Sequence, residues 1–282
     1  MESLRVSKSI KFPFTRLSMR GMLQQRLSAL ASADSSIAPE KISAYRLKHP
    51  TQVIYRSRIT SQLAGGQSGE ELAAKLASIP LNSIDTELIT FRVEISQPGW
   101  LDFHLSDSSF AWWLQQLPQR LCQLRQPPIS EFKENRDDLW VLQYVHARCC
   151  CLLRLGHREG LIQLVEPTYS QSGWQWQTPA AIPWLDSDGN LQLVEPSEKH
   201  LSLQFLAVAD AMDSFSVANW RILATDLGEA VLMFERQCRI FGDIKRKNAK
   251  LCQARLGLIA LSQLLLQVLL EDKLGLSAIR EL

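Results

Sequence analysis

The stretch that most constrains the fold is residues 139–157, which contain no proline and only one glycine, near the end. Apolar residues recur in it at steps of three and four, at Leu142, Val145, Cys149 and Leu152. This spacing indicates a helix with one buried face. Tyr144 and Arg148 are four residues apart, so an aromatic ring and a guanidinium group share a face. Such a pair is able to stack on a base while binding a phosphate, although ordinary helix packing explains the same pattern.

Residues 143–148 read Gln-Tyr-Val-His-Ala-Arg. This hexapeptide resembles the Gln-Tyr-Ala-His-Ala-Arg signature of class I arginyl-tRNA synthetases, where it opens the helical anticodon-binding domain and lies against the anticodon stem-loop. The resemblance implies RNA contacts by Gln143, Tyr144, His146 and Arg148. An intramolecular role as a hydrogen-bond donor stays open for His146.

Length and composition indicate a globular protein, since 282 residues with 46% apolar and 21% charged side chains suggest about two domains. The net charge of +2 gives no global argument for nucleic acid, so a binding surface must come from local clustering. The six cysteines include no Cys-x-x-Cys pair, and three are consecutive, which argues against a zinc site or a disulfide framework. We expect reduced, mostly buried thiols and no metal.

The most apolar run, residues 256–270, contains one serine and two glutamines and is fifteen residues long. It is too short and too polar for a membrane span, so we expect none. The first 33 residues carry six Lys or Arg against one acid, with several serines, which also fits an organellar transit peptide. We expect a cytoplasmic protein, with an organelle as the alternative.

Residues 1–106 are interpreted as a small α/β domain, with a helix over 15–31, strands near 53–55 and 88–95, and a helix opening at Ser68. Residues 100–105 alternate as a half-buried strand, with Leu101, Phe103 and Leu105 inward. The segment Gln-Pro-Gly-Trp-Leu-Asp-Phe-His-Leu at 97–105 is similar to the one that closes the synthetases' N-terminal tRNA-binding domain. Trp100 stands where that segment has phenylalanine, and we interpret it as a core residue.

Residues 107–138 are interpreted as a connector with a short helix and a polar lead-in. In an arginyl-tRNA synthetase the catalytic core would lie here, with its His-x-Gly-His and Lys-Met-Ser-Lys-Ser motifs. Thirty-two residues cannot hold a nucleotide-binding fold, and neither motif occurs in the chain. No Walker loop or nucleophile elbow is present, and the five histidines show no triad or ligand spacing. We therefore expect no enzyme and no cofactor.

Residues 158–197 form an insert rich in tryptophan and proline. Gln-Leu-Val-Glu-Pro occurs at 163–167 and again at 192–196, which suggests two strands of a hairpin. The Asp-Ser-Asp-Gly-Asn run at 186–190 is interpreted as a solvated turn rather than a calcium loop. Three tryptophans, Trp174, Trp176 and Trp184, form a partner surface or stacking platform if they are exposed, and a local core if they are not.

The C-terminal part carries two long amphipathic helices over 220–241 and 251–268, which with 201–214 and 139–155 form a bundle. Residues 223–240 and 254–276 are similar to the closing helices of the synthetase anticodon-binding domain. A basic cluster lies between them. Its candidate RNA contacts are Arg236, Arg239, Lys245, Arg246, Lys247 and Lys250, with Lys245 to Lys247 in a turn and Arg255 also basic. If it lies beside Tyr144 and Arg148, it would hold an RNA backbone with salt-sensitive affinity, although most basic loops are only solvated surface.

The sequence therefore predicts an α+β protein. A small N-terminal α/β domain (1–106) and a connector (107–138) precede an all-α, anticodon-binding-like bundle (139–282) with a short β insert. The leading hypothesis is a non-catalytic relative of arginyl-tRNA synthetase that binds tRNA or other structured RNA. The rival hypothesis is a scaffold or regulatory factor that binds a protein through the bundle and the tryptophan-rich insert. In that case the protein binds no RNA.

Overall fold

A computed structural model describes residues 8–13, 16–31, 37–49, 52–59, 88–97, 100–124, 139–165, 175–214 and 218–281. The chain divides into two compact units. Unit 1 comprises Met1–Trp113 and Ala209–Val217, and unit 2 comprises Leu114–Val208 and Ala218–Leu282. Unit 1 carries a sheet and unit 2 is mainly helical, which confirms the predicted α+β class. The helix expected to open at Ser68 lies outside the described residues.

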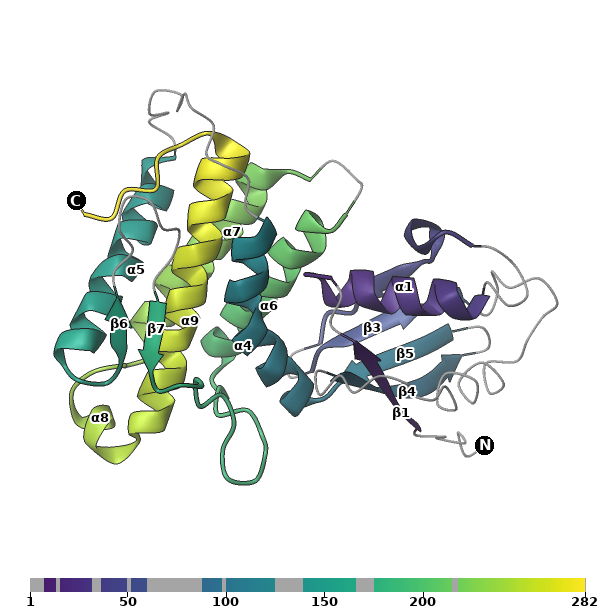
Figure 1. Ribbon diagram of the computed structural model, residues 1–282, viewed down its shortest axis with the longest axis horizontal. Coiled ribbons are helices and arrows are strands. Elements are labelled where there is room, and N and C mark those ends of the chain that lie inside the picture. Colours follow the sequence, from purple (N-terminus) through teal and green to yellow (C-terminus); the bar gives the residue numbers. More distant parts are fainter. Residues whose placement is uncertain are drawn as a thin grey trace. The chain divides into compact units, whose positions relative to one another are not determined.

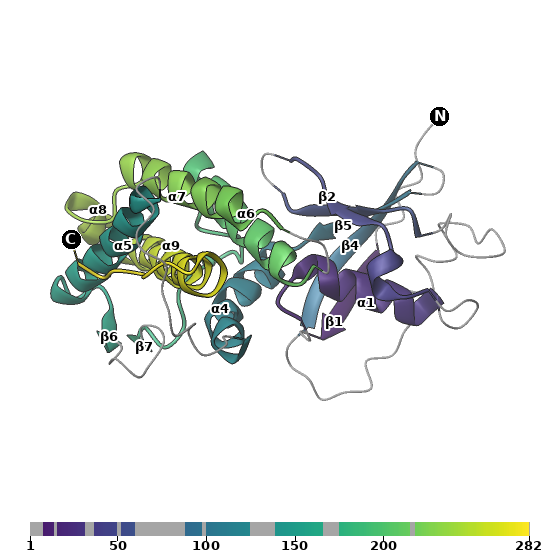
Figure 2. The same ribbon diagram turned by 90° about the horizontal axis from the view of Figure 1, so that it is seen from above.

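Unit 1 is built on one antiparallel sheet with the strand order β1-β4-β5-β3-β2. Its strands are β1 (Lys8–Pro13), β2 (Ala44–Arg46), β3 (Ile54–Ser57), β4 (Leu88–Gln97) and β5 (Trp100–Leu105). Helix α1 (Met19–Ala31) lies over one face of this sheet, and a short 3-10 helix η1 (Pro39–Lys41) follows it (Figures 1 and 2). The N-terminal stretch whose composition also fits a transit peptide thus supplies β1 and α1.

The core of unit 1 lies between α1 and the sheet. Leu101, Phe103 and Leu105 are buried in β5, as predicted, although Asp102 between them is buried as well. Phe103 meets Phe91 edge to face with their ring centroids 6.4 Å apart, and Phe91 meets Tyr55 in the same way at 6.4 Å. From α1, the side chains of Met19, Met22, Leu23 and Leu27 are buried.

The last turn of helix α6 (Pro196–Met212) belongs to unit 1, where two carboxylates bind the start of α1. Ser18 donates its amide N–H to Asp213 at 2.8 Å and its hydroxyl to Asp210 at 2.6 Å. The Tyr55 hydroxyl donates to Asp210 at 3.3 Å. Burial raises the pKa of both Asp210 and Asp213. Ser18 immediately precedes α1, and its hydroxyl oxygen accepts the amide N–H of Gly21 at 2.9 Å, so the two carboxylates hold the residue that caps this helix.

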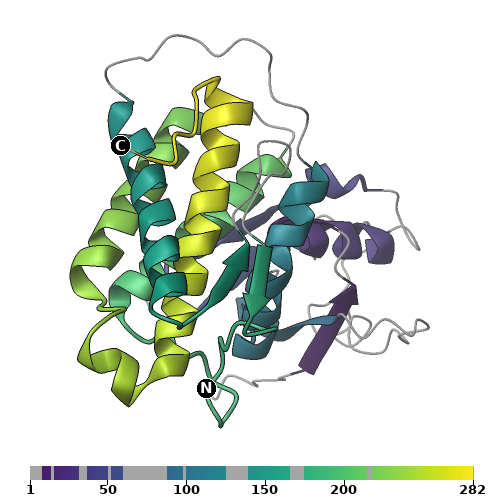
Figure 3. The same ribbon diagram turned by 60° about the vertical axis from the view of Figure 1, so that its left-hand side comes forward.

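Unit 2 packs its longest helices around one central helix. Its helices are the end of α4 (Asp107–Leu124), α5 (Trp140–Arg158), most of α6, α7 (Trp220–Gln237), the short α8 (Asp243–Lys247) and α9 (Ala249–Val268), which continues as a π-helical turn, η2 (Leu269–Leu274). Helices α5, α7 and α9 lie side by side (Figure 3). Asn219 and Asn248 cap the N-termini of α7 and α9 by accepting the amide N–H three residues on.

Helix α9 is the core of unit 2. Ala249–Leu274 is the one helix in the described part of the chain that is long and apolar enough to cross a membrane. Of its most apolar window, 89% is buried inside the protein, as expected for a core helix. Gly257 allows a close approach to α9, because a Cβ atom there would lie 2.6 Å from the indole of Trp184.

The insert differs from the prediction. Strand β6 (Gln163–Val165) pairs antiparallel with β7 (Gln175–Thr178), and not with the second Gln-Leu-Val-Glu-Pro copy. The second copy forms no strand; Leu191, the residue just before it, makes an isolated bridge to Leu185, and the proline of the copy is the first residue of α6. Proline is well tolerated in the first helical turn, where no intrahelical N–H is needed. The two copies of this sequence therefore adopt different structures.

Candidate functional site

Helix α5 divides the hexapeptide 143–148 between its two faces. Gln143 and His146 are buried, with exposed fractions of 5% and 0%, whereas Tyr144 is 38% exposed and Arg148 is also open to solvent. Tyr144 and Arg148 are four residues apart and share the outer face, as their spacing predicts. The structure thus corrects the set of candidate RNA contacts, because Gln143 and His146 face the interior.

The two buried side chains bind the segment 275–281, which we call the strap. Gln143 donates its amide N–H to the carbonyl of Ser277 at 2.8 Å, and His146 Nδ1 lies 2.7 Å from the carbonyl of Ile279. Further along α5, Arg154 donates to the carbonyl of Arg280 at 3.2 Å. The intramolecular role considered for His146 is therefore the one that this geometry fits.

The tautomer of His146 follows from a chain of amides along α9. Gln267 donates to the Glu271 carboxylate at 3.1 Å, and Gln263 donates to Gln267 at 3.4 Å. The Gln263 amide nitrogen also lies 2.8 Å from His146 Nε2, so that ring nitrogen accepts. Nδ1 then carries the proton and donates it to Ile279. Burial lowers the pKa of His146 to about 4, so the ring is neutral at pH 7.

A pocket of about 390 Å³ lies on the outer face of α5, at the strap. It is lined by Tyr144, Ala147, Arg148, Cys151, Arg154, Arg280 and Glu281. Arg148 donates from Nε to Glu235 at 2.7 Å, and this hydrogen bond raises the pKa of the guanidinium. Arg154 lies 3.3 Å from Glu281. The lining of the pocket thus extends along α5 from Tyr144 to Arg154 and includes three arginines and one carboxylate.

A second exposed aromatic residue adjoins this pocket. Trp140 is 56% exposed, and its ring centroid lies 6.3 Å from that of Tyr144 at an interplanar angle of 63°. Together with Val141, which is also exposed, the two rings form an exposed apolar surface on the first turns of α5. Sequence reasoning did not single out Trp140.

Part of the basic cluster lies at the other end of α5. Lys245, on α8, binds the backbone carbonyl and, at 3.1 Å, the carboxylate of Glu159, which directly follows α5. From Tyr144 to Glu159 the helix advances about 22 Å at 1.5 Å per residue. Lys245 on α8 therefore lies far from Tyr144, whereas Arg236 directly follows Glu235, the partner of Arg148.

The cations of the basic cluster, which we call the basic end, differ in the residues that they contact. Arg246 pairs with Asp243 at 2.6 Å, and both side chains are exposed. The other candidates have exposed side chains and no ion pair within the described residues: Arg236, Arg239, Lys247 and Lys250. Four cations are therefore available to an anionic ligand.

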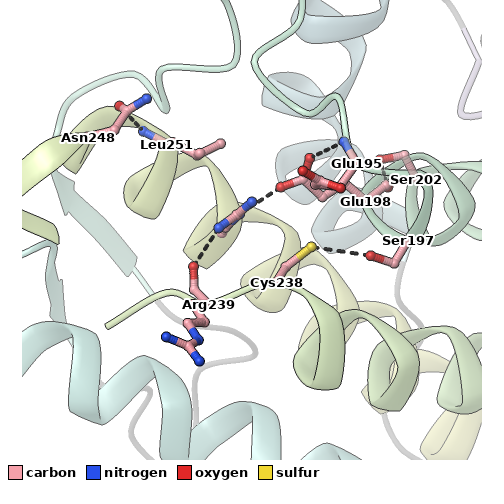
Figure 4. A network of polar contacts seen from close by, with 9 residues as sticks. Glu195, Ser197, Glu198, Ser202, Cys238, Arg239, Asn248 and Leu251 are labelled. Atoms are coloured by element: carbon pink, nitrogen blue, oxygen red, sulfur yellow. Dashed lines mark hydrogen bonds and ion pairs between the residues drawn. The ribbon is translucent and has the colours of Figure 1, made fainter. Parts of the chain in front are cut away.

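Arg255 does not belong to that surface. Its Nε donates to the Glu198 carboxylate at 2.6 Å, and its Nη1 donates to the carbonyl of Arg239 at 2.5 Å (Figure 4). Glu198 is fully buried and also accepts the amide N–H of Glu195 at 2.9 Å. The Arg239 side chain points away from this network in Figure 4. The pair is structural and joins α6, α9 and the segment after α7.

The tryptophans of the insert do not form one surface. Trp184 is 3% exposed and donates from its indole to Gln115 at 3.2 Å, so it belongs to the local core rather than to a partner surface. Trp176 is half-buried and donates to the carbonyl of Pro179 at 2.8 Å. Trp174 lies outside the described residues.

Trp100 differs from its interpretation as a core residue. It is half-buried on the sheet face opposite the core, where the guanidinium of Arg58 lies 4.9 Å from the ring centroid. Tyr45 meets the ring edge on at 6.1 Å. Arg56 binds Asp102 with two hydrogen bonds of 2.7 Å and lies 5.9 Å from the same ring. Since Arg58 covers a face of the indole, Trp100 is not an open platform in this structure.

Arg154, Arg280 and Glu281 are the charged pocket residues that sequence reasoning missed. The position of Arg154 was predictable from the sequence. It lies on one face of α5 with Tyr144, Ala147 and Cys151, at steps of three and four. Arg280 and Glu281 were not predictable in this way, since they belong to a segment more than a hundred residues away that only the fold brings to α5. The part of the chain that the structure describes contains no group of three His, Cys, Asp or Glu able to hold a metal ion.

No protein-family model matches this chain, and comparisons with curated proteins and with solved structures likewise find no match.

We expect Arg255→Met to destabilise the protein strongly, because it leaves the Glu198 carboxylate buried without its partner. Loss of one member of a buried pair typically costs about 3–5 kcal/mol in unfolding free energy. Adding Glu198→Gln should recover much of that loss, since the amide oxygen is still able to accept the Glu195 N–H. Denaturant unfolding of the single and double variants measures both effects, and equal stabilities would contradict the structural role of the pair.

His146 makes stability depend on pH. Its pKa is about 4 in the folded protein against 6.5 unperturbed, so the unfolded chain binds the proton more tightly. The stabilisation is complete above pH 6.5 and is lost as pH falls toward 4. At about 1.4 kcal/mol per pKa unit the full loss is about 3 kcal/mol. The difference in unfolding free energy between wild type and His146→Leu, measured from pH 7 to 4, should shrink by this amount. A constant difference would mean that His146 is not held neutral.

Proposed function

We propose that unit 2 binds structured RNA, with tRNA as the first candidate. In this proposal the Tyr144 pocket takes an unpaired nucleotide and the basic end contacts the backbone. The observation that carries it is the pocket itself, whose lining combines a partly exposed tyrosine ring with Arg148, Arg154 and Arg280. Aromatic rings stack on unpaired bases and guanidinium groups bind phosphates, and RNA-binding proteins combine the two.

The ion pairs already present in the pocket are compatible with this function. The side chain of Arg148 is 43% exposed, so its pair with Glu235 is in contact with water. Such exposed pairs contribute only about 0–1 kcal/mol. The Glu281 side chain that pairs with Arg154 is 80% exposed. An RNA phosphate, which accepts charge-assisted hydrogen bonds from a guanidinium, is therefore able to replace either carboxylate at little cost.

The basic end supports the proposal through its charge. Part of that charge has a structural purpose, because cations near the C-termini of α5 and α7 interact favourably with the helix dipoles. Lys247 and Lys250 lie beyond both helices, on or beside the start of α9, and contact no acid among the described residues. Exposed cations of this kind bind nucleic-acid backbones by releasing counterions.

The resemblance to arginyl-tRNA synthetases agrees with this assignment in part. Of its implied contacts on α5, Tyr144 and Arg148 face outward, while Gln143 and His146 organise the strap. The proposal is a binding function and assigns no catalytic residue. Of the three tryptophans considered for the rival scaffold function, Trp184 is buried and so offers no surface to a partner.

Tyr144→Leu should weaken binding to total tRNA at low salt, whereas Tyr144→Phe should bind as wild type does. Loss of one stacked base typically costs about 1–3 kcal/mol, or roughly 5- to 150-fold in affinity. Fluorescence anisotropy with labelled tRNA measures this difference. The proposal fails if wild type binds no tRNA at low salt, or if Tyr144→Leu binds as tightly as wild type.

Lys247→Glu should lower the salt dependence of tRNA binding. Removing one phosphate contact reduces the slope of log affinity against log salt by about 1. Lys48→Glu is the matched control, since Lys48 is an exposed lysine of unit 1 and the change in net charge is the same. Equal slopes for the two variants would remove the basic end from the proposed interface.

A further inference from the structure

The pocket has two walls that come from distant parts of the chain. Helix α5 supplies Tyr144, Ala147, Arg148, Cys151 and Arg154, and the strap supplies Arg280 and Glu281. We propose that Gln143 and His146 are positioning residues for RNA binding, because they hold the strap where it completes the pocket. This inference rests on the proposed RNA function of the pocket and states how that site is kept in shape.

The strap is set in its path by a turn and two buried side chains. Gly275 ends η2 in the left-handed conformation, with φ of +67°, which favours glycine. The Leu276 amide donates to the carbonyl of Leu270 at 2.8 Å. The side chains of Leu276 and Ala278 are then buried, at 2% and 8% exposure. This reversal directs the chain back along α5.

Beyond Ala278, side-chain hydrogen bonds replace apolar anchors. Ile279 and Arg280 are only half-buried and Glu281 is exposed. This part of the strap is held by two hydrogen bonds to its backbone carbonyls, from His146 to Ile279 and from Arg154 to Arg280. Gln143 holds the preceding carbonyl, that of Ser277. The placement of Arg280 and Glu281 at the pocket therefore depends on donors from α5.

Gln143 and His146 are suited to this task because neither is free to turn toward solvent. His146 is fully buried, and Gln263 binds its second ring nitrogen, so the Nδ1 proton is directed at the strap. Gln143 is also buried and has its amide N–H on the strap. Since both lie on the inner face of α5, they act on RNA only through the strap.

The first measurement follows strap docking without RNA. Release of the strap from α5 exposes the peptide bond after Arg280 to trypsin, and intact mass reports the product. Gln143→Leu should raise the cleavage rate by about fivefold, the effect of one lost hydrogen bond. Gln253→Leu is the matched control, because Gln253 also donates to a backbone carbonyl at 2.8 Å, that of Leu161. Equal cleavage rates in the two variants overturn the inference.

The second measurement separates positioning from general stability. Gln143→Leu should weaken tRNA binding by about fivefold in wild type but by less than about twofold in the Tyr144→Leu background, because both act on one pocket. Ala278→Asp, which disturbs the strap and leaves α5 unchanged, should behave in the same way. Additive losses, or tighter binding when the strap is freed, overturn the inference.

The two proposals fail in different ways. A wild-type protein that binds no tRNA ends the proposed function and this inference together. Wild-type binding that Tyr144→Leu weakens but Gln143→Leu and Ala278→Asp leave unchanged ends only the positioning role.

Discussion

The packing of unit 2 depends on α9, a helix that is buried on almost every side. Because α9 has so little contact with water, each polar side chain on it needs a partner inside the protein. Arg255 finds Glu198 on α6 and the carbonyl of Arg239, and Gln263 finds His146 on α5. These few contacts define where the neighbouring helices lie along α9. Apolar packing alone tolerates sliding between helices, whereas a buried guanidinium or amide does not.

The elements with a strong local pattern were predictable. Helices α5, α7 and α9 follow the apolar spacing of three and four, and β5 follows the alternation of Leu101, Phe103 and Leu105. Pairing was not predictable in the same way. The two Gln-Leu-Val-Glu-Pro copies share a local pattern, yet only the first is a strand, because the second leads directly into α6. Strand β1 was missed as well, since its composition resembles a basic N-terminal segment as much as a strand.

The candidate site was predictable only where neighbours in space are also neighbours on one helix. Tyr144 and Arg148 share the outer face of α5 because they are four residues apart, and the same rule extends to Arg154. The rule does not say which face is outer for each residue, so Gln143 and His146 were assigned to RNA although they are buried. It also says nothing about Arg280, which reaches the pocket through tertiary structure. The rule likewise does not predict that Lys245 binds Glu159, about 22 Å along α5 from Tyr144.

The contribution of α6 to unit 1 has a consequence for how the protein is dissected. The sheet, α1 and the first part of α4 form a continuous stretch of sequence, but Asp210 and Asp213 lie about a hundred residues later. A fragment that stops at residue 113 would lack both carboxylates, and the Tyr55 and Ser18 hydroxyls would lose their acceptor. During synthesis, unit 1 likewise remains incomplete until the ribosome has passed residue 213. The N-terminal unit is thus finished by the chain that follows it, and a separable module must carry the end of α6 with it.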